Sequence, residues 1–293
     1  MTHSTMTRVL TELIELLSLE RIETNLFRGQ SQDLGWGQVF GGQVLGQALS
    51  AAAQTVPPER QVHSLHAYFL RPGDARKPIV YDVDRIRDGQ SFTTRRVVAI
   101  QNGQPIFNMS ASFQVEEEGL DHADSMESVP GPDGLSSQRE IWSRLAHKIP
   151  EPFRTRAVAE QPIEIRHVSP IDPFHPEKKE AHEAIWIRAA GALPDDPALH
   201  RYLLAYASDH AFVTTALRPH GVTWFDFSMQ VASIDHVMWF HRPFRMDDWL
   251  LHVIHSPSAS GARGLVRGSV FSRDGRLVAS TAQEGLLRRR KRG

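Results

Sequence analysis

The segment His66-Ala67-Tyr68-Phe69-Leu70-Arg71-Pro72 has a second copy in Val237-Met238-Trp239-Phe240-His241-Arg242-Pro243. Both copies carry an aromatic residue, then Phe, one further residue and Arg-Pro. The same offset pairs Arg96 with Arg267 further along the chain. A spacing of roughly 170 residues is far longer than the units of solenoid proteins, so we infer a duplicated domain.

Two turn dipeptides extend the alignment. After one inserted residue, Asn102-Gly103 pairs with Asp274-Gly275. Asn-Gly and Asp-Gly supply the positive φ angles of tight hairpin turns. Strand-like runs flank both, at 95–100 and 105–113 in the first half and at 265–271 and 277–282 in the second. Each half is therefore predicted to end in an antiparallel hairpin.

Each half also has one strongly apolar helix ahead of its strands. The first is expected over 43–56, where Pro57-Pro58 ends it, because proline lacks an N–H and disfavours a helical residue before it. The second is expected from Pro197 to about 217, before Pro219 and Gly221. An amphipathic helix over 9–17 precedes both.

The two halves are joined by a polar segment rich in proline and glycine. Residues 116–137 include three consecutive glutamates and Pro130-Gly131-Pro132-Asp133-Gly134, a composition typical of a linker. We predict an α+β protein with an N-terminal half at 1–115, a linker at 116–155 and a C-terminal half at 156–293.

Composition narrows the function. The 293 residues include 33 Lys+Arg against 34 Asp+Glu and 41% apolar residues, which is typical of a globular protein without general affinity for nucleic acid. The absence of cysteine excludes disulfides, thiolate metal sites and cysteine nucleophiles. No apolar run approaches the roughly 18 residues of a membrane span, and the start lacks a signal-peptide core. We expect a cytoplasmic enzyme; the terminal Lys291-Arg292-Gly293 is not a peroxisomal address.

Asp209 is the most informative polar residue. It follows an almost wholly apolar helical run, where an aspartate is rarely tolerated unless it is paired or used in chemistry. Burial would raise its pKa and suit a general base, but a structural aspartate satisfied by backbone or by an arginine fits the pattern as well. No Gly-x-Ser-x-Gly, Walker or His-Glu-x-x-His motif is present.

Polar residues on the expected strands form a second set. Alternation along 231–236 puts Ser233 and Asp235 on one face and His236 on the other. Gln283 continues the small, apolar face of the last strand. By pattern alone both Ser233 and Gln283 are more easily explained as structural, and the 15 histidines form no recognisable set of metal ligands.

Several longer motifs extend along the chain, among them Asn25-Leu26-Phe27-Arg28-Gly29, Val39-Phe40-Gly41-Gly42-Gln43, Phe69-Leu70-Arg71-Pro72-Gly73-Asp74, Ser233-Ile234-Asp235-His236 and Ala279-Ser280-Thr281-Ala282-Gln283-Glu284-Gly285. Through these motifs the sequence resembles the type II acyl-CoA thioesterases, a family with bacterial and peroxisomal members. The resemblance covers about residues 8 to 288.

The resemblance implies a double hotdog fold, in which each half wraps an antiparallel sheet around a long helix. It also implies a catalytic trio of Asp209, Ser233 and Gln283, with Ser233 in a place that other members fill with Thr. The implied reaction is hydrolysis of medium- to long-chain acyl-CoA to fatty acid and coenzyme A, by water that Asp209 activates and without an acyl-enzyme. No metal or cofactor is expected, because coenzyme A is part of the substrate. The resemblance also implies a homo-oligomer, such as a tetramer.

Further expectations concern the substrate's charges. Backbone N–H groups near Gly41-Gly42 could stabilise the oxyanion. The coenzyme phosphates could meet basic residues, whose structural pairing is an equal alternative: Arg71, Arg95, Arg242, Arg263 and Arg267. Two rival functions remain open, a hotdog enoyl-CoA hydratase using Asp172 and His175, and a non-catalytic acyl-CoA-binding protein.

Overall fold

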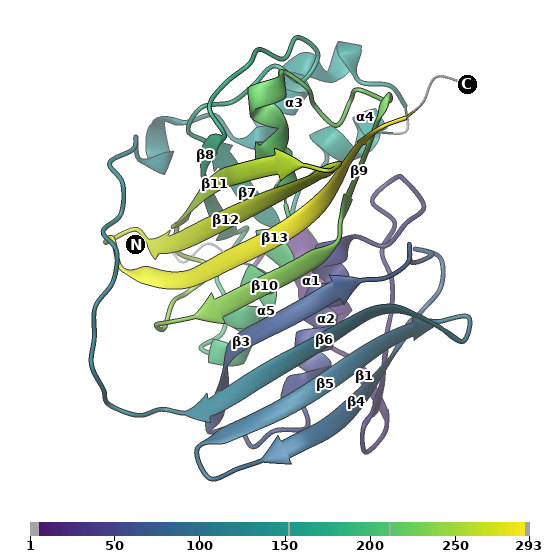
Figure 1. The fold of residues 1–293 in the computed structure, drawn as a ribbon, viewed down its shortest axis with the longest axis vertical. Coiled ribbons are helices and arrows are strands. Elements are labelled where there is room, and N and C mark those ends of the chain that lie inside the picture. The colour runs from purple at the N-terminus through teal and green to yellow at the C-terminus, as the bar shows by residue number, and fades with distance from the viewer. Residues whose placement is uncertain (1–5, 152, 211, 291–293) are drawn as a thin grey trace.

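A single antiparallel sheet of thirteen strands carries both halves of the chain. The computed structural model describes residues 6–151, 153–210 and 212–290; the terminal Lys291-Arg292-Gly293 lies outside them. The strand order is β1-β2-β4-β5-β6-β3-β10-β13-β12-β11-β8-β7, with β9 also paired to β13 (Figure 1). The order β4-β5-β6-β3 in the first half mirrors β11-β12-β13-β10 in the second, so the structure contains the duplication.

In its described part, residues 6–115, the first half contains two helices and six strands. Their bounds are α1 Arg8–Leu17, β1 Glu20–Glu23, β2 Leu26–Gly29, α2 Gly41–Ala53, β3 Arg60–Phe69, β4 Ile79–Asp88, β5 Phe92–Gln101 and β6 Gln104–Val115. The second half contains β7 Ile163–His167, β8 His182–Ala189, α5 Pro197–Ser208, the 3₁₀-helix η3 Val213–His220, β9 Met229–Ser233, β10 Asp235–Phe240, β11 Leu250–Ser260, β12 Arg263–Ser272 and β13 Leu277–Arg289. Helices α1 and α2 match the two predicted in the first half.

Both predicted hairpins are present, with different turns. Between β5 and β6, Asn102 and Gly103 both have positive φ, at 50° and 70°, which is the geometry of a two-residue turn. Between β12 and β13 only Gly275 has positive φ, at 89°, and the Ser272 N–H donates to Arg276 O across a longer turn. The inserted residue seen in the sequence lies in this turn, because Phe271 pairs with Leu277 whereas its counterpart Ile100 pairs with Pro105, one position closer.

The two halves join along one strand pair and one helix pair. Strand β3 pairs with β10, with Tyr68 opposite Asp235 and Ser64 opposite Trp239. On the concave side of the sheet, α2 packs directly against α5 (Figure 1). This contact requires a residue without a side chain, because a Cβ on Gly42 would lie 2.2 Å from the Tyr206 carbonyl oxygen. One apolar core therefore runs through both halves, the double hotdog arrangement expected from the sequence.

The predicted linker contains more structure than its composition suggests. It holds η1 Pro132–Gly134, α3 Gln138–Leu145, η2 Ala146–Lys148 and the start of α4 Phe153–Val158. It runs from β6 along the outside of the second half, where the Trp186 indole N–H donates to Pro130 O at 2.9 Å (Figure 1). The boundaries at 115 and 155 stay predictions.

Candidate active site

Three polar side chains from separate elements of the second half meet at one carboxylate. The Gln283 Nε2 on β13 donates to Asp209 Oδ1 at 2.8 Å, and the Ser233 Oγ at the end of β9 donates to the same oxygen at 3.2 Å. The Asp209 side chain is 5% exposed. The three residues singled out from the sequence therefore form one cluster.

Asp209 lies at the end of α5, which corrects the expected helix to about 217. The α-helix ends at Ser208, Asp209 is its C-cap with φ −83° and ψ −8°, and the chain continues as η3. With these αR dihedrals the Asp209 side chain points sideways from the helix axis, toward the start of α2, where the Gly42 N–H donates to the carboxylate.

A β-bulge brings Ser233 and His236 to the same side, which corrects the expected alternation. Ser233 pairs with Gly285 and Val237 with Ala282, so four steps on one strand oppose three on β13. The extra residue moves the pleat by one position, and a one-residue slip turns side chains to the other face. His236 Nδ1 consequently lies 4.0 Å from Asp209 Oδ1, whereas Asp235 points away and accepts from Glu284 N–H at 2.6 Å.

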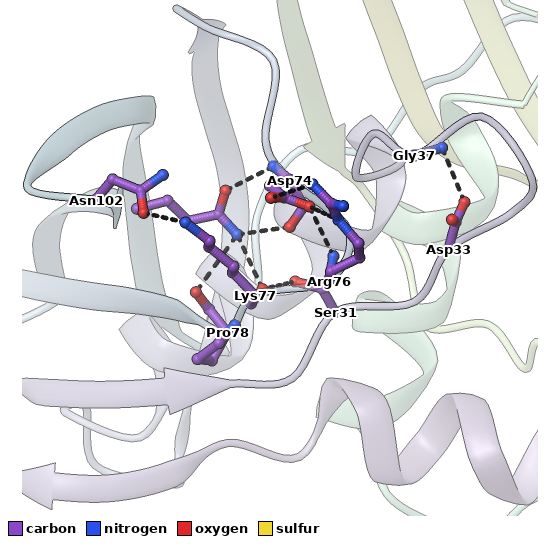
Figure 2. Close-up of polar contacts among 9 residues, drawn as sticks. Ser31, Asp33, Gly37, Asp74, Arg76, Lys77, Pro78 and Asn102 are labelled. Atoms are coloured by element: carbon purple, nitrogen blue, oxygen red, sulfur yellow. Dashed lines mark hydrogen bonds and ion pairs between the residues drawn. The ribbon is translucent and has the colours of Figure 1, made fainter.

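The loop before α2 is held in place by a polar cluster away from the carboxylate (Figure 2). The Ser31 Oγ donates to Lys77 O at 2.7 Å, and Asp33 Oδ1 accepts from Gly37 N–H at 3.0 Å. The Val39 N–H also donates to Gly73 O at 2.9 Å. Each bond fixes backbone just ahead of α2, so the loop delivers the helix N-terminus to Asp209 in a defined position.

Burial dominates the electrostatics of this cluster. Desolvation raises the pKa of Asp209 from 3.8 to about 6, although the hydrogen bonds from Gln283, Ser233 and Gly42 act in the opposite direction. The neighbouring His210 is neutral, because burial lowers its pKa to about 4. An aspartate with a pKa near 6 is ionised at neutral pH and is a stronger base than an exposed one.

A cavity of about 610 Å³ opens onto Asp209. Its size lies within the roughly 300–1,000 Å³ of small-molecule sites. One part of the wall is an aromatic cluster, which we define as Trp142, Phe153, Trp224 and Phe225. The Trp224 and Phe225 rings stack with centroids 4.0 Å apart. Another part is polar and includes Arg139, Arg156 and Glu160. A long apolar group with a charged end fits such a wall.

Much of this wall comes from the predicted linker and the residues directly after it, and was missed in the sequence. Helices α3 and α4 supply Trp142, Arg139 and Arg156, and Arg156 Nη2 donates to Asp33 O on the loop before α2. The charged and aromatic positions on these short helices could have been noticed, but nothing in the sequence aligns them with Asp209. His236 was noticed and assigned to the wrong face.

The arginines proposed from the sequence lie elsewhere. Arg95 is 1% exposed and binds Asp88, Arg242 contacts Asp121, and Arg263 binds Glu284 at 2.9 Å. Arg71 donates to Pro105 O at 2.7 Å, and Arg267 is exposed on β12. Among the described residues that line the cavity, none of these five is present. The alternative of structural pairing with nearby carboxylates fits three of them, Arg95, Arg242 and Arg263.

The other candidate sites gain no support from the geometry. His175 Nδ1 lies 3.0 Å from Asp172 Oδ2, but the His175 side chain is 72% exposed and faces no apolar tunnel. The structure places no three His, Asp or Glu side chains where they could share a metal ion, as far as residues 6–151, 153–210 and 212–290 show. No helix in these residues is long and apolar enough to cross a membrane.

Comparison with known proteins agrees with this architecture. A crystal structure with a hot dog fold from Alicyclobacillus acidocaldarius superposes with a TM-score of 0.75 at 22% identity, covering 94% of this chain and 98% of that one. The sheet order and this superposition therefore place the chain among the double hotdog proteins. Family models described as acyl-CoA thioesterase and acyl-CoA thioesterase N-terminal domain match residues 152–286 and 31–114.

Relatives across the whole chain define the family more closely. Acyl-CoA thioesterase 2 of Haemophilus influenzae is 46% identical, over 97% of this chain and 99% of its own. Human acyl-coenzyme A thioesterase 8 is 41% identical, over 93% and 88%. The crystal structure of the acyl-CoA thioesterase II TesB2 from Mycobacterium marinum has a TM-score of 0.78 and 42% identity, covering 94% and 98%. The chain belongs to the acyl-CoA thioesterase family.

Proposed function

We propose that this protein hydrolyses the thioester of medium- to long-chain acyl-CoA to a free fatty acid and coenzyme A. The observation that carries the proposal is the buried Asp209 carboxylate, held by two neutral donors at the edge of a large, partly aromatic cavity. The family membership supports a thioester as the substrate. Coenzyme A enters as part of that substrate, so the proposed reaction needs no cofactor.

In the proposed mechanism Asp209 is the general base. Its carboxylate takes a proton from water as the water oxygen bonds to the thioester carbonyl carbon. The carbon–sulfur bond then breaks, and the coenzyme A thiolate leaves with the proton returned from Asp209. A base with a pKa of about 6 suits both proton transfers, because it accepts a proton and releases it near neutral pH.

Gln283 and Ser233 are assigned to positioning. Both donate to Asp209 Oδ1, which fixes the carboxylate and leaves the other oxygen for the water. The Gln283 Oε1 is buried and lacks a hydrogen-bond partner among the residues that the structure describes, so it can accept the second hydrogen of the water. The Gly41 N–H, the first of α2, is assigned to the developing oxyanion, helped by the positive end of the helix, because the Gly42 N–H donates to Asp209 and the Gln43 N–H to Phe40 O.

The cavity supports an assignment of the two ends of the substrate. The acyl chain is assigned to the aromatic cluster, where burial of methylene groups is favourable. The phosphates of the coenzyme are assigned to Arg139 and Arg156, the arginines in the polar part of the wall. This replaces the five arginines suggested by the sequence.

The decisive experiment measures thiol release from butyryl- to palmitoyl-CoA, with the fatty acid confirmed as product. The protein, Asp209→Asn and the exposed-acid control Asp172→Asn are compared. We expect turnover by the protein and the control, and a loss of about 100- to 10,000-fold in Asp209→Asn. Mass spectrometry after rapid quenching should find no acyl group on the protein. Silence of the folded protein across the series would leave the binding and hydratase functions.

A further inference from the structure

A further polar side chain, His236 on β10, lies close to Asp209. The His236 ring is fully buried, and its Nδ1 lies 4.0 Å from Asp209 Oδ1. Its Nε2 lies 2.9 Å from the Ser208 Oγ, in the last turn of α5. The Nδ1 has no hydrogen-bond partner among the residues that the structure describes. A buried, unpaired ring nitrogen is costly and calls for an explanation.

The arrangement of Asp209, His236 and Ser208 has the residue types of a Ser-His-Asp triad, but Ser208 is not a nucleophile. Its side chain is fully buried, and Ser208 is not among the described residues that line the cavity, whereas Tyr206, Asp209 and His210 are. The carboxylate and the ring are also too far apart for the hydrogen bond that orients the histidine in a triad. The contact with Ser208 therefore has another use.

Hydrogen-bonding capacity indicates which nitrogen carries the proton. The Ser208 hydroxyl can donate or accept, so it suits either tautomer of His236. In the Nδ1–H tautomer it donates to Nε2. In the Nε2–H tautomer it accepts from Nε2–H and donates to Ala205 O at 2.9 Å. An ionised carboxylate can only accept. A lone pair on Nδ1 would face that negative charge, whereas an N–H would be attracted to it. Asp209 therefore selects the tautomer with Nδ1–H.

We propose that His236 is a positioning residue, which spans from the last turn of α5 to the Asp209 carboxylate as a neutral imidazole with Nδ1–H directed at Oδ1. This inference rests on the proposed role of Asp209 as the base. Its hydrogen bond with Ser208 fixes the ring, and the ring in turn stabilises the ionised carboxylate. Burial lowers the pKa of His236 to about 3, so the ring stays neutral wherever Asp209 is ionised.

The groups around Asp209 determine how removal of the His236 ring should change the pKa of Asp209. Gln283 from β13, Ser233 from β9 and the Gly42 N–H from α2 are neutral donors, and His210 beside it is neutral by burial. No charged side chain is among the causes of the shift in the pKa of Asp209. Removal of a donor dipole destabilises the ionised form, so it moves the pKa of Asp209 upward.

The kinetic test compares two variants of nearly equal shape, His236→Leu and His236→Asn. The Asn amide keeps an N–H donor close to the position of Nδ1, and Leu has none. We expect Leu to raise the pKa of the acid limb of kcat/KM by about half a unit to one unit, and to lower kcat with little change in KM. We expect Asn to restore the profile of the parent. An unchanged or downward-shifted limb in the Leu variant would overturn the inference.

His252 provides the matched control for loss of a buried histidine. It is equally buried, packs against the same Phe212 ring and contacts Thr281 instead of Asp209. His252→Leu should therefore lower the melting temperature about as much as His236→Leu and leave the acid limb where it was. A shift of the limb in both variants would reduce His236 to a packing residue.

A spectroscopic measurement separates this inference from the proposed function. In protein with nitrogen-15-labelled histidine, the His236 ring signals are assigned by their loss in His236→Asn. Above about pH 7, where Asp209 is ionised, Nδ1 should be the protonated nitrogen. An unprotonated Nδ1 would exclude the proposed role. This measurement needs no turnover, so an inactive parent would contradict the proposed function without deciding the tautomer.

Discussion

The Asp209 carboxylate fills the space where a side chain at position 41 would stand. A Cβ on Gly41 would lie 2.5 Å from Asp209 Oδ2 and 3.0 Å from the Phe69 ring. The second carboxylate oxygen is thus pressed against the first residue of α2. Glycine at this position is a steric requirement of the site as well as a feature of the helix start.

Gly41→Ala should consequently impair turnover. Since the extra methyl group displaces the carboxylate, and a misplacement of about 1 Å can cost about 100-fold in rate, we expect kcat to fall by about that factor. Gly46→Ala is the control, because its Cβ would meet Leu17 and the Tyr202 carbonyl instead. It should lower the melting temperature with little effect on kcat. Equal kcat losses in both variants would point to helix packing.

The rate should depend on pH through Asp209. The base acts only when ionised, and its pKa is about 6. We therefore expect kcat/KM for a saturated acyl-CoA to fall about tenfold per unit below about pH 6 and to level off above it. Rates measured across about pH 5 to about pH 8, with the fold checked at each pH, test this. A profile flat down to about pH 5 would argue against Asp209 as the base.

The raised pKa of Asp209 also has a consequence for stability. Its folded-state pKa lies above the ordinary value of 3.8, so the folded state binds the proton more tightly than the unfolded state does. The free energy of unfolding therefore decreases as pH rises through about 6. At neutral pH, Asp209→Asn should be more stable than the parent by up to about 3 kcal/mol. Urea unfolding at neutral pH and near pH 4 measures this. The advantage should shrink at the lower pH, and a constant difference would contradict the linkage.

The aromatic cluster should limit the length of the acyl chain. Trp142→Ala removes a ring that lies 5.8 Å from Phe225, centroid to centroid, and so enlarges the apolar part of the cavity. We expect the optimum of kcat/KM to move to longer acyl chains. Trp239→Ala is the control, since Trp239 is 37% exposed on the strand face away from the cavity. An unmoved optimum would place the acyl chain elsewhere.

The sequence predicted the elements of the fold better than the details of the site. Apolar periodicity located α1 and α2, and the turn dipeptides located both hairpins. The alternation rule failed at Ile234, between β9 and β10. A bulge there turns every later side chain to the opposite face, and the order of apolar and polar residues does not reveal it. It therefore separated Ser233 from His236.

The cavity wall was beyond prediction for a different reason. Helices α3 and α4 have 8 and 6 residues, too few for a helix to be stable on its own. The Ser137-x-x-Glu140 capping box marks the start of α3 in the sequence, but no local pattern shows that α3 and α4 pack over the site. The end of α5 at Ser208 is similar, since the chain leaves the helix where Asp209 meets the start of α2.

The joining of two similar halves in one chain allows them to differ. In the alignment of the two halves that pairs Arg71 with Arg242, Ser233 corresponds to Val62. After the one inserted residue, Gln283 corresponds to Ala111. Both first-half residues are buried and apolar. In a symmetric dimer of identical subunits, any substitution appears at both sites at once. Covalent duplication removes this constraint, so one copy could evolve as a scaffold while the other retained the polar residues.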